Sequence, residues 1–246
     1  MKIFKIIIFS TYYCTFLLCT TIECLEKCDI HATITRHVEN EGFHRELHSL
    51  IEVIMGQPKL LTKCYVVLEE LLPSGLYVNP DQLADLRRLG QVSACAQGHV
   101  DVEAPKQNSS SHLVHVYSFL EQTQNLLSAK VILPFHLRYH NPKPSGGYAQ
   151  VHLDAPTLLL HCPVKVPCLE KHKKVIAPCR PCGKAKCQWH SVPYKTNSPN
   201  IKLSVPVGNL DHYFLVTVCT LFVTCVAAVY ILSVAIVSKQ QQGKYD

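Results

Sequence analysis

Charged residues and glycines are both scarce in this sequence. Only 17% of its 246 residues are charged, whereas a soluble domain usually has about a quarter, and only 10 are glycine. So few glycines exclude a collagen-like chain, and an apolar fraction of 48% excludes a chain that is disordered throughout. Low charge together with a positive mean hydropathy is unusual for a wholly soluble protein, so the apolar residues must be concentrated somewhere.

The familiar catalytic motifs are also missing. The sequence contains no G-x-S-x-G elbow, no P-loop and no G-x-G-x-x-G. Acids are sparse as well, because only Glu121 and Asp154 lie between Glu103 and Glu170. The sequence therefore argues against an enzyme and predicts neither catalytic residues nor a cofactor.

Fourteen histidines raise the question of a metal site, and two pairs of them lie four residues apart. His44 and His48 are four residues apart, but the acid between them is not at the second position, as it is in H-E-x-x-H. His136 and His140 would lie about 13 Å apart along a strand, which is too far for one ion. We expect surface histidines and no metal site.

The first apolar run, residues 1–21, is typical of a secretory signal peptide. Lys2 and Lys5 precede an uncharged run, and small or polar residues end it. Cys19-x-Thr21 suits a cut before Ile22, although a cut after Cys24 is an alternative. An uncleaved anchor helix is the other interpretation.

The second apolar run, residues 213–237, contains 25 residues without a charge. About 20 apolar residues are enough to cross the bilayer. Asp211 precedes the run, and Lys239 and Lys244 follow it, so the positive-inside rule places the C-terminus in the cytosol. We therefore expect a type I protein with a luminal domain over 22–212, a transmembrane helix over 213–237 and a cytoplasmic tail over 238–246.

The cysteines of the expected domain are typical of an oxidising compartment. Cys179 and Cys182 have redox C-x-x-C spacing, and together with Cys187 and His190 they could also hold zinc. Structural disulfides are favoured over both, with the connectivity left open. The candidates are Cys64, Cys95, Cys162, Cys168, Cys179, Cys182 and Cys187.

Two further surface features can be read from the domain. Asn108 begins the only proline-free N-x-S/T sequon, in a polar stretch that suits a surface loop, so we expect glycosylation there. Residues 165–187 contain seven basic residues against Glu170, a local charge of +6. A solvated loop between strands is favoured for this segment over a site for lipid headgroups.

The domain interior favours strands. Residues 63–68, 113–117 and 201–205 are rich in β-formers or alternate, and a turn at 142–147 should join 131–139 to 148–153 as a hairpin with a long loop. Pro134 suggests an edge or a bulge. One helix is predicted by a capping residue at Asn79, by Pro80 directly after it and by Gly90 at its end. The fold class expected is mainly β, a sandwich-like domain with a short helix and one C-terminal transmembrane helix.

A series of segments resembles the PIG-X family (phosphatidylinositol-glycan biosynthesis class X). The resemblance covers about residues 31–237 in consistent order and includes the topology. The segments are Gly42–Arg45, Leu72–Pro80, Asp101–Pro105, Leu133–His140, Ala177–Cys179, Cys187–Trp189 and Val205–Gly208.

The resemblance implies a non-catalytic subunit of the endoplasmic reticulum membrane. Its partner would be a PIG-M-type mannosyltransferase that adds the first mannose to the glycosylphosphatidylinositol (GPI) precursor, with membrane lipid as the other contact and no nucleic acid. The domain and the helix are both available surfaces. Thr217, Thr220 and Thr224 share a helix face that suits packing against another helix, although hydroxyls bonded within their own helix are an equal alternative.

Two functions of other classes remain open from the sequence. The type I topology also suits a cell-surface receptor or adhesion module. Cys179 and Cys182 could instead belong to a luminal thiol oxidoreductase.

Overall fold

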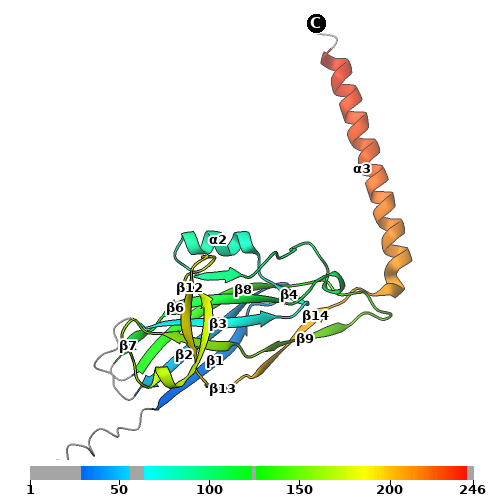
Figure 1. The fold of residues 1–246 in the computed structure, drawn as a ribbon. Helices are drawn as coiled ribbons and strands as arrows, with labels where there is room; N and C mark the ends of the chain where they lie inside the picture. Colours follow the sequence, from blue (N-terminus) through cyan, green and yellow to red (C-terminus); the bar gives the residue numbers. More distant parts are fainter. Residues whose placement is uncertain (1–28, 56–63, 124–125, 243–246) are drawn as a thin grey trace, which may run out of the picture. The chain divides into compact units, whose positions relative to one another are not determined.

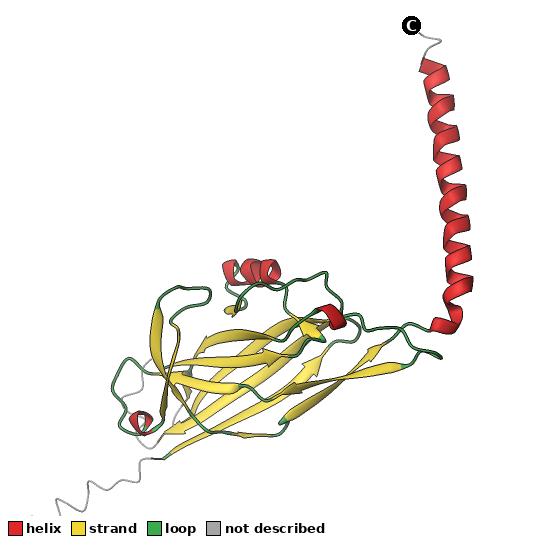
Figure 2. Cartoon of the chain, turned by 45° about the vertical axis from the view of Figure 1, so that its right-hand side comes forward, coloured by secondary structure: helices red, strands yellow, loops and turns green. Residues whose placement is uncertain are grey.

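A computed structural model describes residues 29–55, 64–123 and 126–242, and the side chains as far as Ile236. The expected signal peptide lies outside the described residues, as does Cys24. The described residues form two six-stranded sheets, a two-stranded sheet, a short helix and a long C-terminal helix (Figures 1 and 2). The fold is therefore mainly β with one C-terminal apolar helix, as expected.

The first sheet contains the two longest strands side by side. Its order is β13-β1-β2-β8-β4, with β7 also paired to β8, and all pairs are antiparallel except β1 with β13. The strands are β1 Ile30–Glu39, β2 His44–Met55, β4 Leu76–Tyr77, β7 Glu121–Thr123, β8 Leu126–Leu137 and β13 Lys195–Thr196. Pro134 lies in β8 between the stretches that pair with β7 and β4, so in the described residues it occupies a locally open edge.

The second sheet is antiparallel throughout, in the order β11-β12-β10-β3-β6-β5. Its strands are β3 Tyr65–Leu72, β5 Ala94–Ala96, β6 His112–Phe119, β10 Thr157–His161, β11 Lys173–Pro178 and β12 Lys186–Ser191. Within the described residues, short 3-10 helices occur at Lys106–Asn108, at Leu169–Lys171 and, directly before the C-terminal helix, at Leu210–His212.

The core forms because the strands alternate between buried and exposed residues. Ile34 in β1, Ile51 in β2 and Phe135 in β8 are fully buried, as are Leu68 and Leu158 of the second sheet. A second apolar cluster covers the opposite face of the second sheet, where Val67 and Leu159 pack with Ala177 and Trp189. Both faces of this sheet are thus partly buried.

The short helix α2 spans Pro80–Arg88, as its capping residues predict. The Asn79 side chain accepts hydrogen bonds from the backbone N–H groups of Asp81 and Gln82. Leu83 is buried, and Gly90 adopts a φ of 71° just after the helix.

The expected hairpin between 131–139 and 148–153 is wrong. β9 (Tyr148–Asp154) pairs with β14 (Asn200–Pro206) in the two-stranded sheet. The turn residues do reverse the chain, but their hydrogen bonds go to the segment that precedes the C-terminal helix: Lys143 N–H donates to Gly208 O, and Val207 N–H to Gly147 O. A turn motif specifies a reversal, and the partner strand is decided by distant sequence.

The chain divides into two compact units. One comprises residues 1–138 and 151–203, and the other comprises 139–150 and 204–246. The second unit contains the turn at 142–147 and the C-terminal helix α3, Tyr213–Gln242.

Candidate interaction surfaces

Helix α3 has the length and composition to span a membrane. The candidate span Leu210–Ile236 has 27 residues, its most apolar 18-residue window has a mean hydropathy of 2.5, and none of that window is buried by the rest of the described chain. Large apolar side chains such as Phe222 and Ile231 are more than 60% exposed along it. Such a surface requires lipid or another apolar helix around it.

The three threonines that suit helix packing lie on this exposed helix. Thr217 Oγ1 donates to Tyr213 O at 2.8 Å, and Thr224 Oγ1 lies 2.9 Å from Thr220 O. The hydroxyls of Thr217 and Thr224 are therefore satisfied within their own helix. Packing of this face against a partner stays a prediction.

The base of α3 is fixed within its own unit by a network of polar contacts. Asp211 accepts a hydrogen bond from Ser145 N–H at 3.0 Å, and Asn209 Oδ1 caps Asp211 N–H at 2.9 Å. Leu210 N–H donates to Lys143 O. A Cβ on Gly208 would lie 3.2 Å from Pro142 Cβ, so the close approach favours glycine at this position. The segment Val205–Gly208, which contributes to the family resemblance, thus anchors the helix to the turn.

Four of the resembling segments meet at the end of β8. Arg138 N–H donates to Gly75 O at 2.8 Å, and its Nη1 donates to Ala104 O at 2.6 Å. Leu137 N–H donates to Phe43 O at 2.8 Å. These contacts join Leu133–His140 to Leu72–Pro80, Asp101–Pro105 and Gly42–Arg45. Sequence reasoning did not identify this junction, because the resemblance marked the four segments separately and not the contacts between them.

Interactions with Tyr77 and Asp101 offset part of the cost of burying the charge of Arg138 at this junction. The residue is only 4% exposed, and its guanidinium lies 4.6 Å from the centroid of the Tyr77 ring. Burial lowers the pKa of Arg138, while Tyr77 and Asp101 oppose that shift. Arg138 therefore acts as a structural hub that holds loops in place.

His136 lies beside the hub and links α2 to the first sheet. Its Nε2 is 3.0 Å from Gln82 Oε1 and 3.4 Å from His44 Nδ1, and its ring stacks on Tyr77. Burial, and next the charge of His44, lower the pKa of His136, which favours the neutral imidazole. His44 is thus a cross-strand contact of His136.

The cysteine candidates form disulfide bonds within the first unit, two of them between distant parts of the sequence. The pairs are Cys64–Cys162, Cys95–Cys182 and Cys179–Cys187. Cys168 is also disulfide-bonded. Cys179–Cys187 closes the hairpin of β11 and β12, whereas Cys95–Cys182 fastens the tip of that hairpin to β5.

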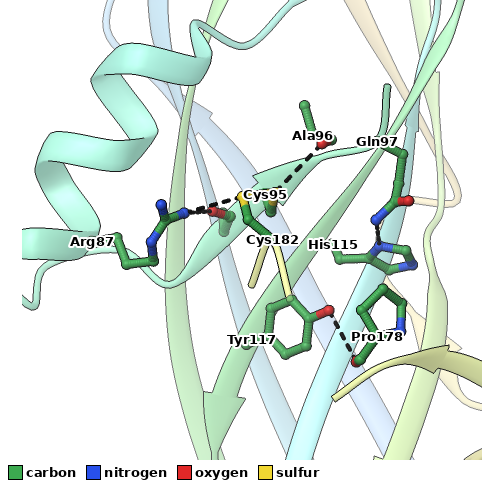
Figure 3. Close-up of a disulfide and its surroundings, with 9 residues drawn as sticks. Arg87, Cys95, Ala96, Gln97, His115, Tyr117, Pro178 and Cys182 are labelled. Carbon is green, nitrogen blue, oxygen red and sulfur yellow. Dashed lines mark hydrogen bonds between the residues drawn. A yellow bond between two sulfur atoms is a disulfide. The ribbon is translucent and has the colours of Figure 1, made fainter. Parts of the chain in front are cut away.

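Hydrogen bonds around the Cys95–Cys182 disulfide also hold the β11–β12 hairpin against the domain (Figure 3). Arg87 of α2 donates to Ala94 O at 3.1 Å, and its Nη1 lies 3.4 Å from Cys182 Sγ. Tyr117 donates its hydroxyl to Pro178 O at 3.2 Å. Burial raises the pKa of Tyr117 to about 12, so this hydroxyl keeps its proton. The hairpin is a fixed part of the domain.

The C-x-x-C spacing does not produce a redox pair. Cys179 and Cys182 belong to different disulfides, so they do not form the single dithiol couple of a thiol oxidoreductase. The same bonds occupy the sulfurs of the alternative zinc set with His190. In both the redox and the zinc alternative, the cysteine sulfurs are already used in structural disulfides.

The basic segment is a hairpin and not the loop between strands that the sequence suggested. Most of residues 165–187 belongs to β11, the start of β12 and the turn between them, and only Glu170 offsets the charge, in an ion pair with Lys174 at 2.9 Å. The basic residues are all exposed: Lys165, Lys171, Lys173, Lys174, Arg180, Lys184 and Lys186. The β11–β12 hairpin and the residues just before it therefore present an exposed basic surface.

Asn108 lies at the end of an exposed 3-10 turn, Lys106–Asn108. The turn is held by Ser109, whose hydroxyl donates to Pro105 O at 2.8 Å, and Ser110 of the sequon is exposed. The site is sterically open, and its glycosylation stays a prediction.

Comparisons with known proteins agree on one family. The family model of PIG-X / PBN1 matches residues 40–236. A human protein described as "GPI alpha-1,4-mannosyltransferase I, stabilizing subunit" is 34% identical over 81% of this chain and 78% of its own length. Proteins of the same description from Rattus norvegicus and Mus musculus are each 33% identical over 78% of this chain. The family-model match covers most of the β-rich unit and helix α3 as far as residue 236.

Proposed function

The chain belongs to the PIG-X / PBN1 family, and from this premise we propose that it is the non-catalytic stabilizing subunit of GPI alpha-1,4-mannosyltransferase I in the endoplasmic reticulum membrane. The observation that carries the proposal is the similarity to stabilizing subunits over about four fifths of the chain. A subunit of this kind acts by mass action, because binding only the folded partner raises that partner's stability.

The proposed arrangement is type I. Residues 1–21 would direct the chain into the lumen, 22–212 would form the luminal domain, α3 would cross the membrane, and 238–246 would face the cytosol. The described disulfides support a luminal place for the β-rich domain, because such bonds persist in oxidising compartments.

Helix α3 is the proposed contact with the multi-spanning catalytic subunit. Its uncovered apolar surface requires a partner or lipid, and Thr217, Thr220 and Thr224 provide a face on which another helix can approach closely. Membrane lipid would cover the opposite face.

The test is complementation in cells that lack their own stabilizing subunit. Expression of this chain should restore the level of the catalytic subunit and of GPI-anchored proteins at the surface, and the two subunits should co-purify. If both levels stay unchanged while the chain accumulates in the endoplasmic reticulum, the proposal is wrong.

A helix variant tests the proposed face. Thr217→Leu/Thr220→Leu/Thr224→Leu fills the close-approach surface and should weaken co-purification. Phe222→Leu/Val226→Leu/Val229→Leu changes the opposite side of the same helix and is the matched control. Equal co-purification of both variants would exclude the threonine face as the contact.

A further inference from the structure

Four polar side chains converge on the outer face of the β1–β2 ladder, although no short motif joins them. The register places His37 opposite His48 and Glu39 opposite Glu46. Residues two apart on a strand point to the same face, so His-Val-Glu on β1 and Glu-Leu-His on β2 form one square of donors. The two strands lie side by side in the first sheet (Figure 1).

The donor atoms of this square are already gathered. Glu39 Oε1 is 2.9 Å from His37 Nε2, and Glu39 Oε2 is 3.4 Å from His48 Nε2. Glu46 Oε2 is 3.2 Å from His48 Nε2. One ligand atom from each of His37, Glu39 and His48 can be chosen so that all lie within 4.8 Å of one another. In a tetrahedral zinc site with bonds of about 2.0–2.1 Å, neighbouring ligand atoms are about 3.3 Å apart.

Hydrogen bonds alone leave the polar atoms of these side chains poorly paired. His48 Nε2 faces oxygens of two different carboxylates, but a single N–H cannot donate well to both. His48 is also only 7% exposed, so its ring is fixed, while the side chains of His37 and Glu39 are 58% and 52% exposed and leave the site open to solvent. A cation between the four groups could take one donor atom from each of them.

We propose that His37, His48, Glu39 and Glu46 bind one divalent metal ion of the zinc class and thereby fasten β1 to β2 next to their connecting turn. Two imidazoles and two carboxylates form a nitrogen and oxygen donor set that suits zinc. Two carboxylates balance the charge of the ion. The positive charge of Lys130 also acts on Glu39.

The test measures zinc binding by the full-length chain in detergent. The chain is purified through a tag without histidine, treated with chelator and dialysed against zinc, and its metal content is then determined. We expect one bound zinc per chain. His37→Asn and Glu39→Gln should each lower the affinity at least about tenfold, since loss of even an outer partner of a metal ligand costs about 10–100-fold.

The matched controls lie on the same ladder and face. His31→Asn removes an exposed histidine about 20 Å further along β1, and Glu52→Gln removes a carboxylate that faces Thr33. Neither should change zinc binding. Zinc should also raise the melting temperature of the wild type but not that of His37→Asn, and circular dichroism without zinc checks that each variant is folded.

The absence of stoichiometric zinc from the wild type would overturn the proposal. Unchanged affinity in the folded His37→Asn and Glu39→Gln variants would also overturn it, as would an equal loss in the two controls. None of these measurements depends on the mannosyltransferase partner.

Discussion

Arg36 and Glu70 form an ion pair between the two six-stranded sheets. Arg36 Nη2 lies 2.9 Å from Glu70 Oε2, and both side chains are at most 1% exposed. Arg36 also donates to Asp154 O at 2.9 Å. Two charges in an apolar core are costly unless each compensates the other, so the pair fixes how β1 and β3 face one another.

Removing only the cation should destabilise the domain strongly. Arg36→Met leaves the Glu70 carboxyl buried without its partner, and we expect the free energy of unfolding to fall by about 3–5 kcal/mol. Arg36→Met/Glu70→Leu should recover most of that loss, because no buried charge remains. Denaturant titration of the full chain in detergent measures both. Arg88→Met, which breaks an exposed pair with Asp85, is the control and should have little effect.

Glu70 should also make stability depend on pH. Burial raises the pKa of Glu70 to about 7, against the opposing effect of Arg36. Between the ordinary value near 4.5 and 7 the folded state then binds more protons than the unfolded state, so stability falls as pH rises through that window and levels off above it. Denaturant titrations of the wild type and of Glu70→Gln from pH 4.5 to 8 measure this; parallel curves would contradict it.

At the scale of elements, the disulfides hold the β11–β12 hairpin onto the domain. Cys95–Cys182 spans 87 residues, whereas Cys179–Cys187 spans 8. Cross-linking a longer loop removes more entropy from the unfolded chain, although Cys64–Cys162 shortens the effective loop of the first bond.

We expect Cys95→Ser/Cys182→Ser to lower the free energy of unfolding by about 1–2 kcal/mol more than Cys179→Ser/Cys187→Ser does. Replacing both cysteines of a bond avoids leaving a reactive thiol. Denaturant midpoints under non-reducing conditions give the comparison, and an equal loss in the two variants would show that local contacts such as Tyr117 with Pro178 dominate.

Local sequence signals predicted well which residues form the short helix and the strands. They predicted poorly which strands pair with one another. Asn79, Pro80 and Gly90 act through neighbouring backbone groups, so helix α2 could be predicted from sequence. β9 was assigned to the wrong partner, because its pairing with β14 depends on residues about 50 positions away.

The contacts that define the candidate sites join residues far apart in the sequence. Arg36 with Glu70, Cys95 with Cys182, and Arg138 with Ala104 lie on different elements, and no spacing rule connects them. His37 and His48 come together only through the strand register. The family resemblance located the Arg138 junction only as separate segments, since it carried no information on which segments touch.

At the scale of the whole molecule, the proposed function requires the β-rich domain and the end of α3 to lie on opposite sides of the membrane. Arg138 and the disulfides hold the first unit together, while Asp211 and Asn209 anchor α3 within the second. Each unit is thus stabilised by its own internal contacts. What the proposal still depends on is the side of the membrane on which the β-rich domain lies.

Asn108 provides the test of that orientation. Its exposed sequon should carry one glycan if the domain is luminal, and that glycan should stay sensitive to endoglycosidase H if the protein remains in the endoplasmic reticulum. Asn108→Gln and Ser110→Ala should both abolish the mobility shift on a gel, because the sequon needs both side chains. Asn197→Gln is the matched control and should leave the shift unchanged, since Pro199 disqualifies that sequence. A resistant glycan would indicate transit to the cell surface and favour the receptor interpretation.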